Sequence, residues 1–293
     1  MLGVGWIRKR TVEERMVTNT AFAALTILDF YNERLKIEEY RGNLRELLNT
    51  CLEIAGENKF TKLIIKVKSA DQLLLLESGF TLEAVIKNYF YTEHAYIYCK
   101  YLNEIRRTTS KWIDEDRLIE NVKALEISPL KDISASFHIR KAVIDDCLSL
   151  SNLYKEIFDI YPVPITDPSY IEKTMKEGTI YYCIEHENKI ISAASAEIND
   201  KHCNAEITDC ATLPPYRKYQ FMQHLITALE EELRKKHIFS AYSIARAPSF
   251  GMNKVFYQLH YTYTGRLINN CYIYEELENM NVWCKDLSRN KTL

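Results

Sequence analysis

The hydrophobic and polar residues of this chain follow two periods, and the change from one to the other predicts an ordered series of strands and helices. In residues 1–125, strict alternation indicates strands, and apolar positions three and four residues apart indicate helices. The predicted elements are a hairpin of residues 20–29 and 34–40 that turns at Asn32-Glu33, a helix at 44–55, a strand at 63–67, a short helix at 71–78, and strands at 82–89 and 95–101.

A longer series of the same kind begins at residue 137. Strands are predicted at 137–140, 180–185, 190–197, 205–212, 239–245, 262–268 and 281–285, and helices at 143–158, from 167, from 221 and at 249–259. Residues 159–166 are broken by two prolines and are predicted to be irregular. Asp167 followed by Pro168 has the form of a helix start, with Asp as cap and Pro in the first turn.

Both series end in the order strand, helix, strand, strand. The letters also resemble each other, because Tyr96-Ile97-Tyr98-Cys99-Lys100 stands beside Asn281-Val282-Trp283-Cys284-Lys285. This predicts two related halves. Residues 108–125 are charged and helical in pattern, and residues 126–136 are polar with a proline. We therefore expect one domain at 1–125, a connector at 126–136 and a second domain at 137–293.

A basic turn precedes the helix predicted from residue 221. The strand at 205–212 leads through Pro214-Pro215-Tyr216 to Arg217 and Lys218, and directly into the helix. The first N–H groups of a helix and the positive end of its dipole form an anion site. With two cations beside it, the site suits a pyrophosphate, which an acyl carrier such as coenzyme A presents; the alternative is an ordinary solvated turn. No basic turn precedes the helix at 44–55, so we expect no cofactor in the first half.

The composition of the chain narrows the classes of molecule that it is expected to bind. The formal net charge is −2 at pH 7, which argues against nucleic acid or an anionic membrane and favours a small molecule. No apolar run approaches the roughly 20 residues of a transmembrane helix, and the N-terminus lacks the apolar core of a secretory signal. The eight cysteines form no CxxC pair, so we expect reduced thiols in a cytoplasmic protein and no metal site. Composition leaves the oligomeric state open.

The order of elements from 137 to 285 resembles the GNAT family of acetyl-coenzyme A-dependent N-acetyltransferases. The most specific part runs from Ala205-Glu206-Ile207 to Arg217 and looks like the family's fourth strand and pyrophosphate loop, which usually reads R/Q-x-x-G-x-G/A. The resemblance implies an α/β fold of α+β layers, with a GNAT fold in the C-terminal half and a partial or degenerate GNAT-like N-terminal half. It also implies that acetyl-CoA binds at Thr212, Leu213, Arg217, Lys218, Tyr219, Gln220, Phe221 and Met222.

This loop departs from the family at both small-residue positions, which are Gln220 and Met222 here. Backbone N–H groups still donate if these residues keep a negative φ, because glycine serves close approach and positive φ and not the hydrogen bond itself. We expect weaker acetyl-CoA binding or a displaced loop.

Within the family, the second half looks most like the β-lysine N-acetyltransferases, which make the osmolyte N-acetyl-β-lysine. Four segments carry this resemblance: Tyr161-Pro162-Val163-Pro164-Ile165, Thr208 to Pro214, Ser249-Phe250-Gly251-Met252-Asn253 and Asn281-Val282-Trp283. It implies that the acceptor is the side-chain amine of free β-lysine. Another small amine, a protein lysine, and a non-catalytic module that binds acyl-coenzyme A stay open as alternatives.

Glu206 is the first candidate for the general base. An alkyl ammonium has a pKa near 10.4, so a carboxylate that removes its proton is useful, and related acetyltransferases place their base glutamate in a similar Ala-Glu-Ile context. The alternative is a carboxylate at a solvated strand end. Regular alternation puts Glu206, Thr208, Cys210 and Thr212 on one face and Asp209 on the other, so Asp209 shares the task only if a bulge rotates the strand.

The remaining candidates come from the fold that the resemblance implies. The backbone N–H of Cys210 lies where it polarises the thioester carbonyl, while its thiol is better explained by packing than as a nucleophile. Many members carry a general-acid tyrosine where Phe256 stands here, which leaves the next residue, Tyr257, as a weak candidate. Asp159, Tyr161, Asp167, Asp209, Asn269 and Asn270 are candidates for the substrate cleft.

Overall fold

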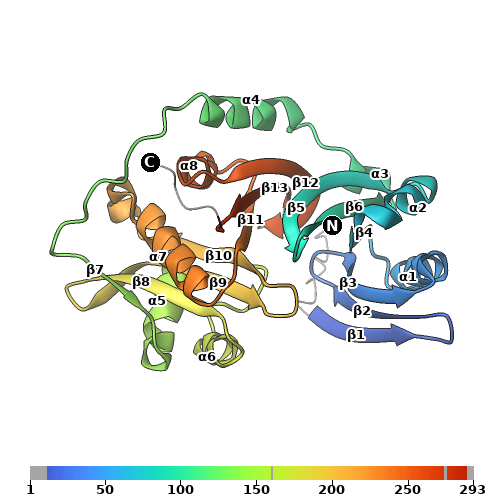
Figure 1. Ribbon diagram of the computed structural model, residues 1–293, viewed down its shortest axis with the longest axis horizontal. Helices are drawn as coiled ribbons and strands as arrows, with labels where there is room; N and C mark the ends of the chain where they lie inside the picture. The colour runs from blue at the N-terminus through green and yellow to red at the C-terminus, as the bar shows by residue number, and fades with distance from the viewer. Residues whose placement is uncertain (1–11, 160, 274–275, 289–293) are drawn as a thin grey trace, which may run out of the picture.

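The computed structural model describes residues 12–159, 161–273 and 276–288. Its N-terminal half alternates strands with two helices (Figure 1). These elements are β1 (Val12–Thr18), β2 (Phe22–Asp29), β3 (Arg34–Gly42), α1 (Leu44–Glu57), β4 (Lys62–Val67), the 3₁₀ turn η1 (Ser69–Asp71), α2 (Gln72–Glu77), β5 (Thr81–Phe90) and β6 (Glu93–Tyr101). Every strand and helix predicted here is confirmed, whereas the exposed edge strand β1 is an addition.

Two helices, α3 (Glu104–Arg107) and α4 (Trp112–Lys123), connect this half to the next. The C-terminal half then comprises β7 (His138–Lys141), η2 (Ile144–Asp146), α5 (Cys147–Ile157), α6 (Pro168–Lys176), β8 (Ile180–His186), β9 (Lys189–Asn199), β10 (Asn204–Thr212), η3 (Pro214–Tyr219), α7 (Phe221–Lys235), β11 (Ser240–Arg246), α8 (Phe250–Gln258), β12 (Thr262–Ile273) and β13 (Glu276–Asp286). Asp167 caps α6, as predicted, by accepting a hydrogen bond from the Ser169 N–H.

The strands form one sheet in the order β1-β2-β3-β4-β6-β5-β12-β13-β11-β10-β9-β8-β7. In each half a parallel pair, β3–β4 or β10–β11, is connected through a long helix, α1 or α7. In each half the last strand, β6 or β13, then inserts between its two predecessors. The two halves therefore repeat the same strand order.

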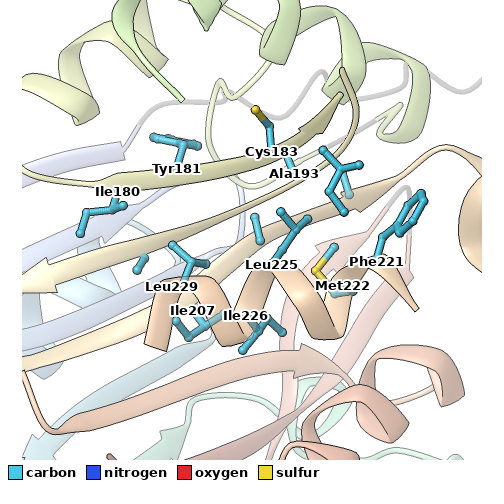
Figure 2. Packing of buried hydrophobic residues seen from close by; sticks show 14 of the residues in the cluster. Ile180, Tyr181, Cys183, Ala193, Ile207, Phe221, Met222, Leu225, Ile226 and Leu229 are labelled. Atoms are coloured by element: carbon cyan, nitrogen blue, oxygen red, sulfur yellow. The ribbon is translucent and has the colours of Figure 1, made fainter. Parts of the chain in front are cut away.

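The C-terminal half packs helices on both faces of its sheet. Strand β9 is buried from Ile190 to Ala196 without alternation, as expected for a strand covered on both sides, and both α5 and α7 contact it. Figure 2 shows the apolar face of α7, with Leu225, Ile226 and Leu229, against strand residues such as Ile207. This face contains the positions that predicted the helix from sequence.

The N-terminal half carries helices on one face only. Its core lies under α1 and α2 and takes Leu35 and Ile37 from β3 and Leu63 and Ile65 from β4. The intervening residues of these strands face the other way, toward the C-terminal half. Within the described ranges, no helix has the length and apolar character that crossing a membrane requires.

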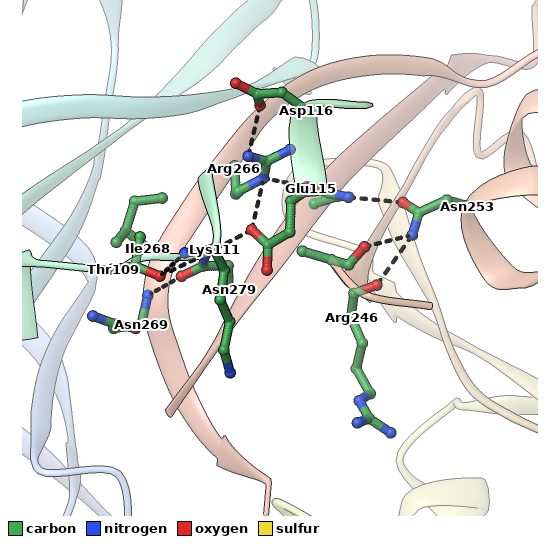
Figure 3. A network of polar contacts seen from close by, with 12 residues as sticks. Thr109, Lys111, Glu115, Asp116, Arg246, Asn253, Arg266, Ile268, Asn269 and Asn279 are labelled. Atoms are coloured by element: carbon green, nitrogen blue, oxygen red, sulfur yellow. Dashed lines mark hydrogen bonds and ion pairs between the residues drawn. The ribbon is translucent and has the colours of Figure 1, made fainter. Parts of the chain in front are cut away.

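Helix α4 belongs with the C-terminal half by its packing. Its Ile119 and Val122 join the C-terminal core. Its Glu115 and Asp116 contact Arg266 of β12 at 3.5 and 2.7 Å (Figure 3). The boundary predicted at residue 125 therefore separates a helix from the core that it completes.

The two halves meet where β5 and β12 cross. Gly265 of β12 pairs with Ala84 of β5, and a Cβ on Gly265 would lie 2.2 Å from the carbonyl oxygen of Glu83. Gly265 also has φ +147°, a conformation reserved for glycine. A side chain at this position would push the halves apart.

A bulge in β12 locks this strand onto the N-terminal half. The β12–β13 register slips between Leu267 and Cys271, so the intervening backbone has no regular partner strand. Lys62 Nζ donates to the Ile268 carbonyl at 2.6 Å, and Arg34 Nη1 donates to the Asn270 carbonyl at 2.9 Å. Two cations from the parallel pair β3–β4 thus bind the bulge, and Arg106 Nη2 of α3 also donates to the Asn270 carbonyl at 3.0 Å.

A matching bulge in β5 locks the N-terminal half onto the parallel pair β10–β11. Here Ser240 Oγ donates to the Lys87 carbonyl at 2.9 Å, and Asn204 Nδ2 donates to the Tyr89 carbonyl at 2.7 Å. The accepting residues follow Ala84 by three and five positions, as Ile268 and Asn270 follow Gly265. We call these two sets of contacts the reciprocal locks, because each half binds a bulge of the other through two side chains at equivalent positions. Such an arrangement is expected for a duplicated unit whose copies are related by a pseudo-twofold axis.

Replacing Gly265 tests the crossing point. We expect Gly265→Ala to lower the free energy of unfolding by about 3 kcal/mol or more, because overpacking against backbone and a glycine-only conformation each cost about 1–3 kcal/mol. Gly56 in α1 is the matched control, since a Cβ there meets nothing within 4 Å. Gly56→Ala should stabilise by about 0.5–1 kcal/mol. Urea unfolding measures both, and equal effects of the two changes would contradict this account.

Candidate active site

A cleft of about 1210 Å³ runs between the two halves and along the parallel pair β10–β11. Its walls include β3 and β4 on one side and β10, β11 and the start of α7 on the other. Pockets that hold small molecules measure roughly 300–1,000 Å³, so this cleft has room for two substrates at once.

The cleft opens into the C-terminal half because β10 and β11 separate. Their register covers only Asn204 to Glu206, which pair with Ser240 to Tyr242. One more contact follows, from Ser243 Oγ to the Ile207 carbonyl at 2.7 Å. Beyond it, the last residues of β10 are paired with β9 on one side and line the cleft on the other.

A bulge in β10 turns Asp209 into the cleft. Thr208 pairs with Ser195 and Ala211 with Ala193, so two residues of β10 stand opposite one of β9. Asp209 has φ +49° and accepts a hydrogen bond from Ser195 Oγ at 2.6 Å. The prediction from regular alternation, that Asp209 faces away from Glu206, is therefore wrong, and the exception that a bulge would create is what the strand adopts.

Glu206 lies half-buried in the cleft, beside this bulge. Burial raises the pKa of its carboxyl, and the charge of Asp209 adds to the increase. A hydrogen bond with Tyr242 and the charges of Lys66 and Lys36 act in the opposite direction. Glu206 thus keeps a higher affinity for a proton than an ordinary glutamate, which suits a group that accepts one.

Glu197 is a third carboxylate of the cleft, and the sequence analysis did not select it. Its Cα pairs directly with that of Glu206 across β9 and β10. Burial raises the pKa of Glu197 to about 8, helped by the charges of Glu206 and Asp209, although water in the open cleft reaches this side chain and screens these effects. In the sequence, the signal for this residue was a glutamate that directly follows a run of small residues in β9.

The opposite wall is basic and comes from the N-terminal half. Lys36 and Glu38 of β3 and Lys66 of β4 line the cleft. Glu38 forms ion pairs with both lysines, at 3.5 Å to Lys36 and closer to Lys66, and these charges lower its pKa to about 2 against the effect of burial. The alternation of charged and apolar residues from Arg34 to Glu38 was a sequence signal for this wall.

The start of α7 is uncapped and borders the cleft. No side chain of the described residues caps this helix, whose first residue is preceded by Gln220 with φ +58°. The condition that the loop residues keep a negative φ therefore fails at Gln220, which adopts the left-handed conformation that glycine would take. Phe221 borders the cleft, but its side chain is buried and packs on Phe137 at 4.8 Å between ring centroids.

This arrangement fits a pyrophosphate group. The uncapped N–H groups of α7 and the side chain of Arg217 border the cleft, together with Gln220 and Met222. Arg217 Nε donates to the Thr212 carbonyl at 3.2 Å, which holds its exposed guanidinium beside the helix start. The residues present therefore suit acetyl-CoA at this position despite the missing glycines.

Other predicted cofactor contacts lie outside this cleft. Leu213 is buried, and its N–H donates to the Ile191 carbonyl. Tyr219 packs against Phe137, and Lys218 Nζ lies over the Tyr219 ring. Of the neighbouring positions, Thr212 does line the cleft.

The predicted substrate residues divide in the same way. Tyr161 and Asn270 line the cleft, and the Tyr161 hydroxyl lies within hydrogen-bonding reach of Asp209. Asp159 is exposed outside the lining, Asp167 caps α6, and Asn269 Nδ2 donates to the Arg106 carbonyl of α3 at 3.0 Å.

The two remaining catalytic candidates are Tyr257 and the thiol of Cys210, and the contacts of each define its role. The Tyr257 hydroxyl donates to the Lys123 carbonyl at 2.8 Å, outside the cleft, so Tyr257 is not positioned to protonate a leaving group. Cys210 lies in the bulge, and burial raises the pKa of its thiol, which keeps it protonated as expected of a packed thiol.

Two of the sequence segments that carried the family resemblance meet at one side chain. Asn253 Oδ1 accepts from Asn281 Nδ2 at 2.9 Å and from Trp283 Nε1 at 2.8 Å. Asn253 Nδ2 donates to the Arg246 carbonyl (Figure 3). This network fixes α8, whose Ser249 also lines the cleft, against β11 and β13.

Comparison with known proteins agrees with this geometry. The model of the Acetyltransferase (GNAT) family matches residues 149–261. N-acetyltransferase YodP of Bacillus subtilis is 41% identical over 273 residues, which span 93% of this chain and 99% of that protein. A Beta-lysine N(6)-acetyltransferase of Methanosarcina mazei is 33% identical over 270 residues, which span 85% of this chain and 100% of that protein.

Among solved structures, an N-acetyltransferase from Staphylococcus aureus Mu50 is similar to 52% of this chain and 99% of its own, with 14% identity and a TM-score of 0.46. Identity that extends over nearly the full length of YodP establishes the relationship at the level of sequence. The chain belongs to the GNAT family of N-acetyltransferases.

Proposed function

We propose that this enzyme transfers the acetyl group of acetyl-CoA to the side-chain amine of β-lysine, giving N-acetyl-β-lysine. The observation that carries the proposal is a cleft in which an anion site at α7 leads to carboxylates on β9 and β10. The full-length similarity to a β-lysine N(6)-acetyltransferase supports this acceptor, and the similarity to YodP supports acetyl transfer without specifying the amine.

In this mechanism, acetyl-CoA supplies an acetyl thioester, held by Arg217 and the N–H groups that start α7. Glu206 accepts a proton from the substrate ammonium, directly or through water, and so frees the nitrogen lone pair for attack on the thioester carbonyl. The C–N bond forms and the C–S bond breaks, coenzyme A leaves as the thiolate, and the second proton of the nitrogen passes through water to give coenzyme A thiol. We assign the backbone N–H of Cys210 as the donor to the carbonyl oxygen, by its place in the bulge.

Asp209 is a second candidate for the base, and the bulge favours it. Its carboxyl lies in the same cleft, and burial raises its pKa while Ser195 and Tyr161 lower it by hydrogen bonding. These two hydroxyl partners also suit a carboxylate that orients the amine. Glu206 has one such partner, Tyr242, and stays the first choice.

Substitution of the two carboxylates separates these roles. We expect Glu206→Gln to lower kcat with β-lysine about 10²–10⁴-fold, the usual contribution of a general base, measured as release of coenzyme A thiol. Glu177→Gln, at an exposed position after α6, should change kcat less than about twofold. If Asp209→Asn lowers kcat while Glu206→Gln stays active, the base is Asp209. If both variants keep full activity, neither carboxylate is the base.

The pH profile tests the environment of Glu206. Because burial raises its pKa above the ordinary 4.5, Glu206 is protonated at pH values where other glutamates are ionised. We therefore expect kcat/KM to fall as the pH drops through a midpoint above 4.5 and to recover at higher pH. The residual activity of Glu206→Gln should lack this limb. A wild-type midpoint at or below 4.5 would contradict the assignment.

Substitution of two adjacent cations, Arg217 and Lys218, tests the proposed anion site. Arg217 lines the cleft, whereas Lys218 does not. We expect Arg217→Met to raise KM for acetyl-CoA about tenfold with little change in kcat, because a hydrogen bond to a charged group contributes about 1.5–3 kcal/mol. Lys218→Met should raise it less than about twofold, and equal effects would indicate general electrostatic attraction in place of a defined contact.

A further inference from the structure

The acceptor part of the cleft has walls of opposite charge, contributed by different halves of the chain. Glu197, Glu206 and Asp209 line it from the C-terminal half. Lys36 and Lys66 face them from β3 and β4. The walls are close, because Lys36 acts electrostatically on both Glu197 and Glu206. A molecule bound between them meets carboxylates at one end and ammonium groups at the other.

Lys36 is the cation of this wall that is most available to a ligand. Lys66 Nζ is held by Glu38 and by the Tyr89 hydroxyl, and 16% of its side chain is exposed. Arg34 is committed to Asp29 and to the β12 bulge. Lys36 has its ion pair with Glu38 at 3.5 Å and is 30% exposed. Glu38 serves two lysines, so a carboxylate arriving from the cleft would give Lys36 a partner of its own.

The duplicated fold explains why Lys36 faces Glu206. Arg34 pairs with Lys62 as Asn204 pairs with Ser240, and both pairs hold the reciprocal locks. Two residues further along the same strands come Lys36 and Glu206. They therefore occupy equivalent positions in the two halves and face the shared cleft with opposite charge. The N-terminal copy presents a cation where the C-terminal copy presents the proposed base.

An amino-acid acceptor requires this polarity. Its side-chain ammonium must lie at the carboxylate wall to lose a proton, and its own carboxylate must then lie elsewhere, because three carboxylates would repel it. The ammonium of Lys36, which is partly exposed, is a charged partner for it at the opposite wall. A diamine without a carboxylate would leave Lys36 without that partner.

We propose that the N-terminal half binds the carboxylate of the acceptor through Lys36, so that the enzyme selects amino acids over carboxylate-free amines. This inference rests on the proposed function and adds to it the carboxylate subsite. Lys36 contacts substrate without taking part in proton transfer. Its removal therefore weakens binding and leaves the chemical step intact.

The test compares each amino acid with a partner that lacks the charge. Initial rates with acetyl-CoA are measured for β-lysine and its carboxamide, and for α-lysine and 1,5-diaminopentane, using wild type, Lys36→Met, Lys36→Arg and Lys68→Met. Lys68 is the matched control, because its ion pair with Glu93 is exposed and lies outside the cleft lining. Circular dichroism checks that each variant is folded.

We expect wild type to prefer β-lysine over its carboxamide by about tenfold or more in kcat/KM, the value of one charge-assisted contact. At a pH well above the Glu206 limb, where loss of the Lys36 charge leaves the base ionised, Lys36→Met should raise KM for β-lysine by a similar factor. There kcat and the carboxamide rates should stay nearly unchanged, so that the preference disappears. Lys36→Arg should retain most of the preference, and Lys68→Met all of it.

An equal loss with charged and uncharged acceptors in Lys36→Met, or no loss, would overturn the subsite while leaving the acetyltransferase in place. A wild type that acetylates the diamine faster than either amino acid would do the same. If wild type turns over none of the four acceptors, calorimetric titration with β-lysine decides: absence of binding overturns both proposals, and binding that Lys36→Met abolishes keeps the subsite while the proposed reaction fails.

Discussion

Two bulges carry backbone groups that no strand can pair, and the molecule depends on how these groups are satisfied. A buried carbonyl without a donor costs about 1–3 kcal/mol, so each bulge must find one. Each finds it in the opposite half, where β3–β4 or β10–β11 supplies two side chains. The halves are thereby joined by specific polar contacts at both ends of a crossing that one close-packed pair, Ala84 and Gly265, holds at its centre.

This reciprocity also explains the division of labour. The side chains that bind each bulge lie at the start of a parallel strand pair. The cleft-lining residues that follow them along these strands therefore face the space between the two halves. In the C-terminal half the strands separate there and α7 begins without a cap. In the N-terminal half the corresponding helix α1 is capped by Asn43, whose side chain accepts from the Glu46 N–H. The helix start is thus capped in one copy and uncapped in the other, and strands β3 and β4 of the first copy line the shared cleft.

Sequence periodicity predicted nearly all strands and helices, because burial on one face or two sets a period that is readable residue by residue. It failed where conformation depends on a neighbour far away in the chain. The inward turn of Asp209 requires the β9–β10 register, and the left-handed Gln220 requires the packing of Phe221 on Phe137. The places of Lys36 and Glu197 in the cleft lining were missed because only the apposition of the two halves makes a cleft there. Tyr257 was a weak candidate taken from alignment to a family position, and its hydroxyl instead contacts the carboxyl end of α4.

The β12 lock has a consequence for folding during synthesis. Lys62 precedes its partner Ile268 by 206 residues, so at about 5–20 residues per second the N-terminal half leaves the ribosome roughly 10–40 s before that partner exists. During this interval its helix-free face and the edge strand β5 are open to other nascent chains. Charged side chains on such a surface discourage edge-to-edge association, and Lys36, Lys62 and Lys66 all lie on that face. These lysines thus disfavour association of the N-terminal half with other chains until β12 and β13 have been synthesised.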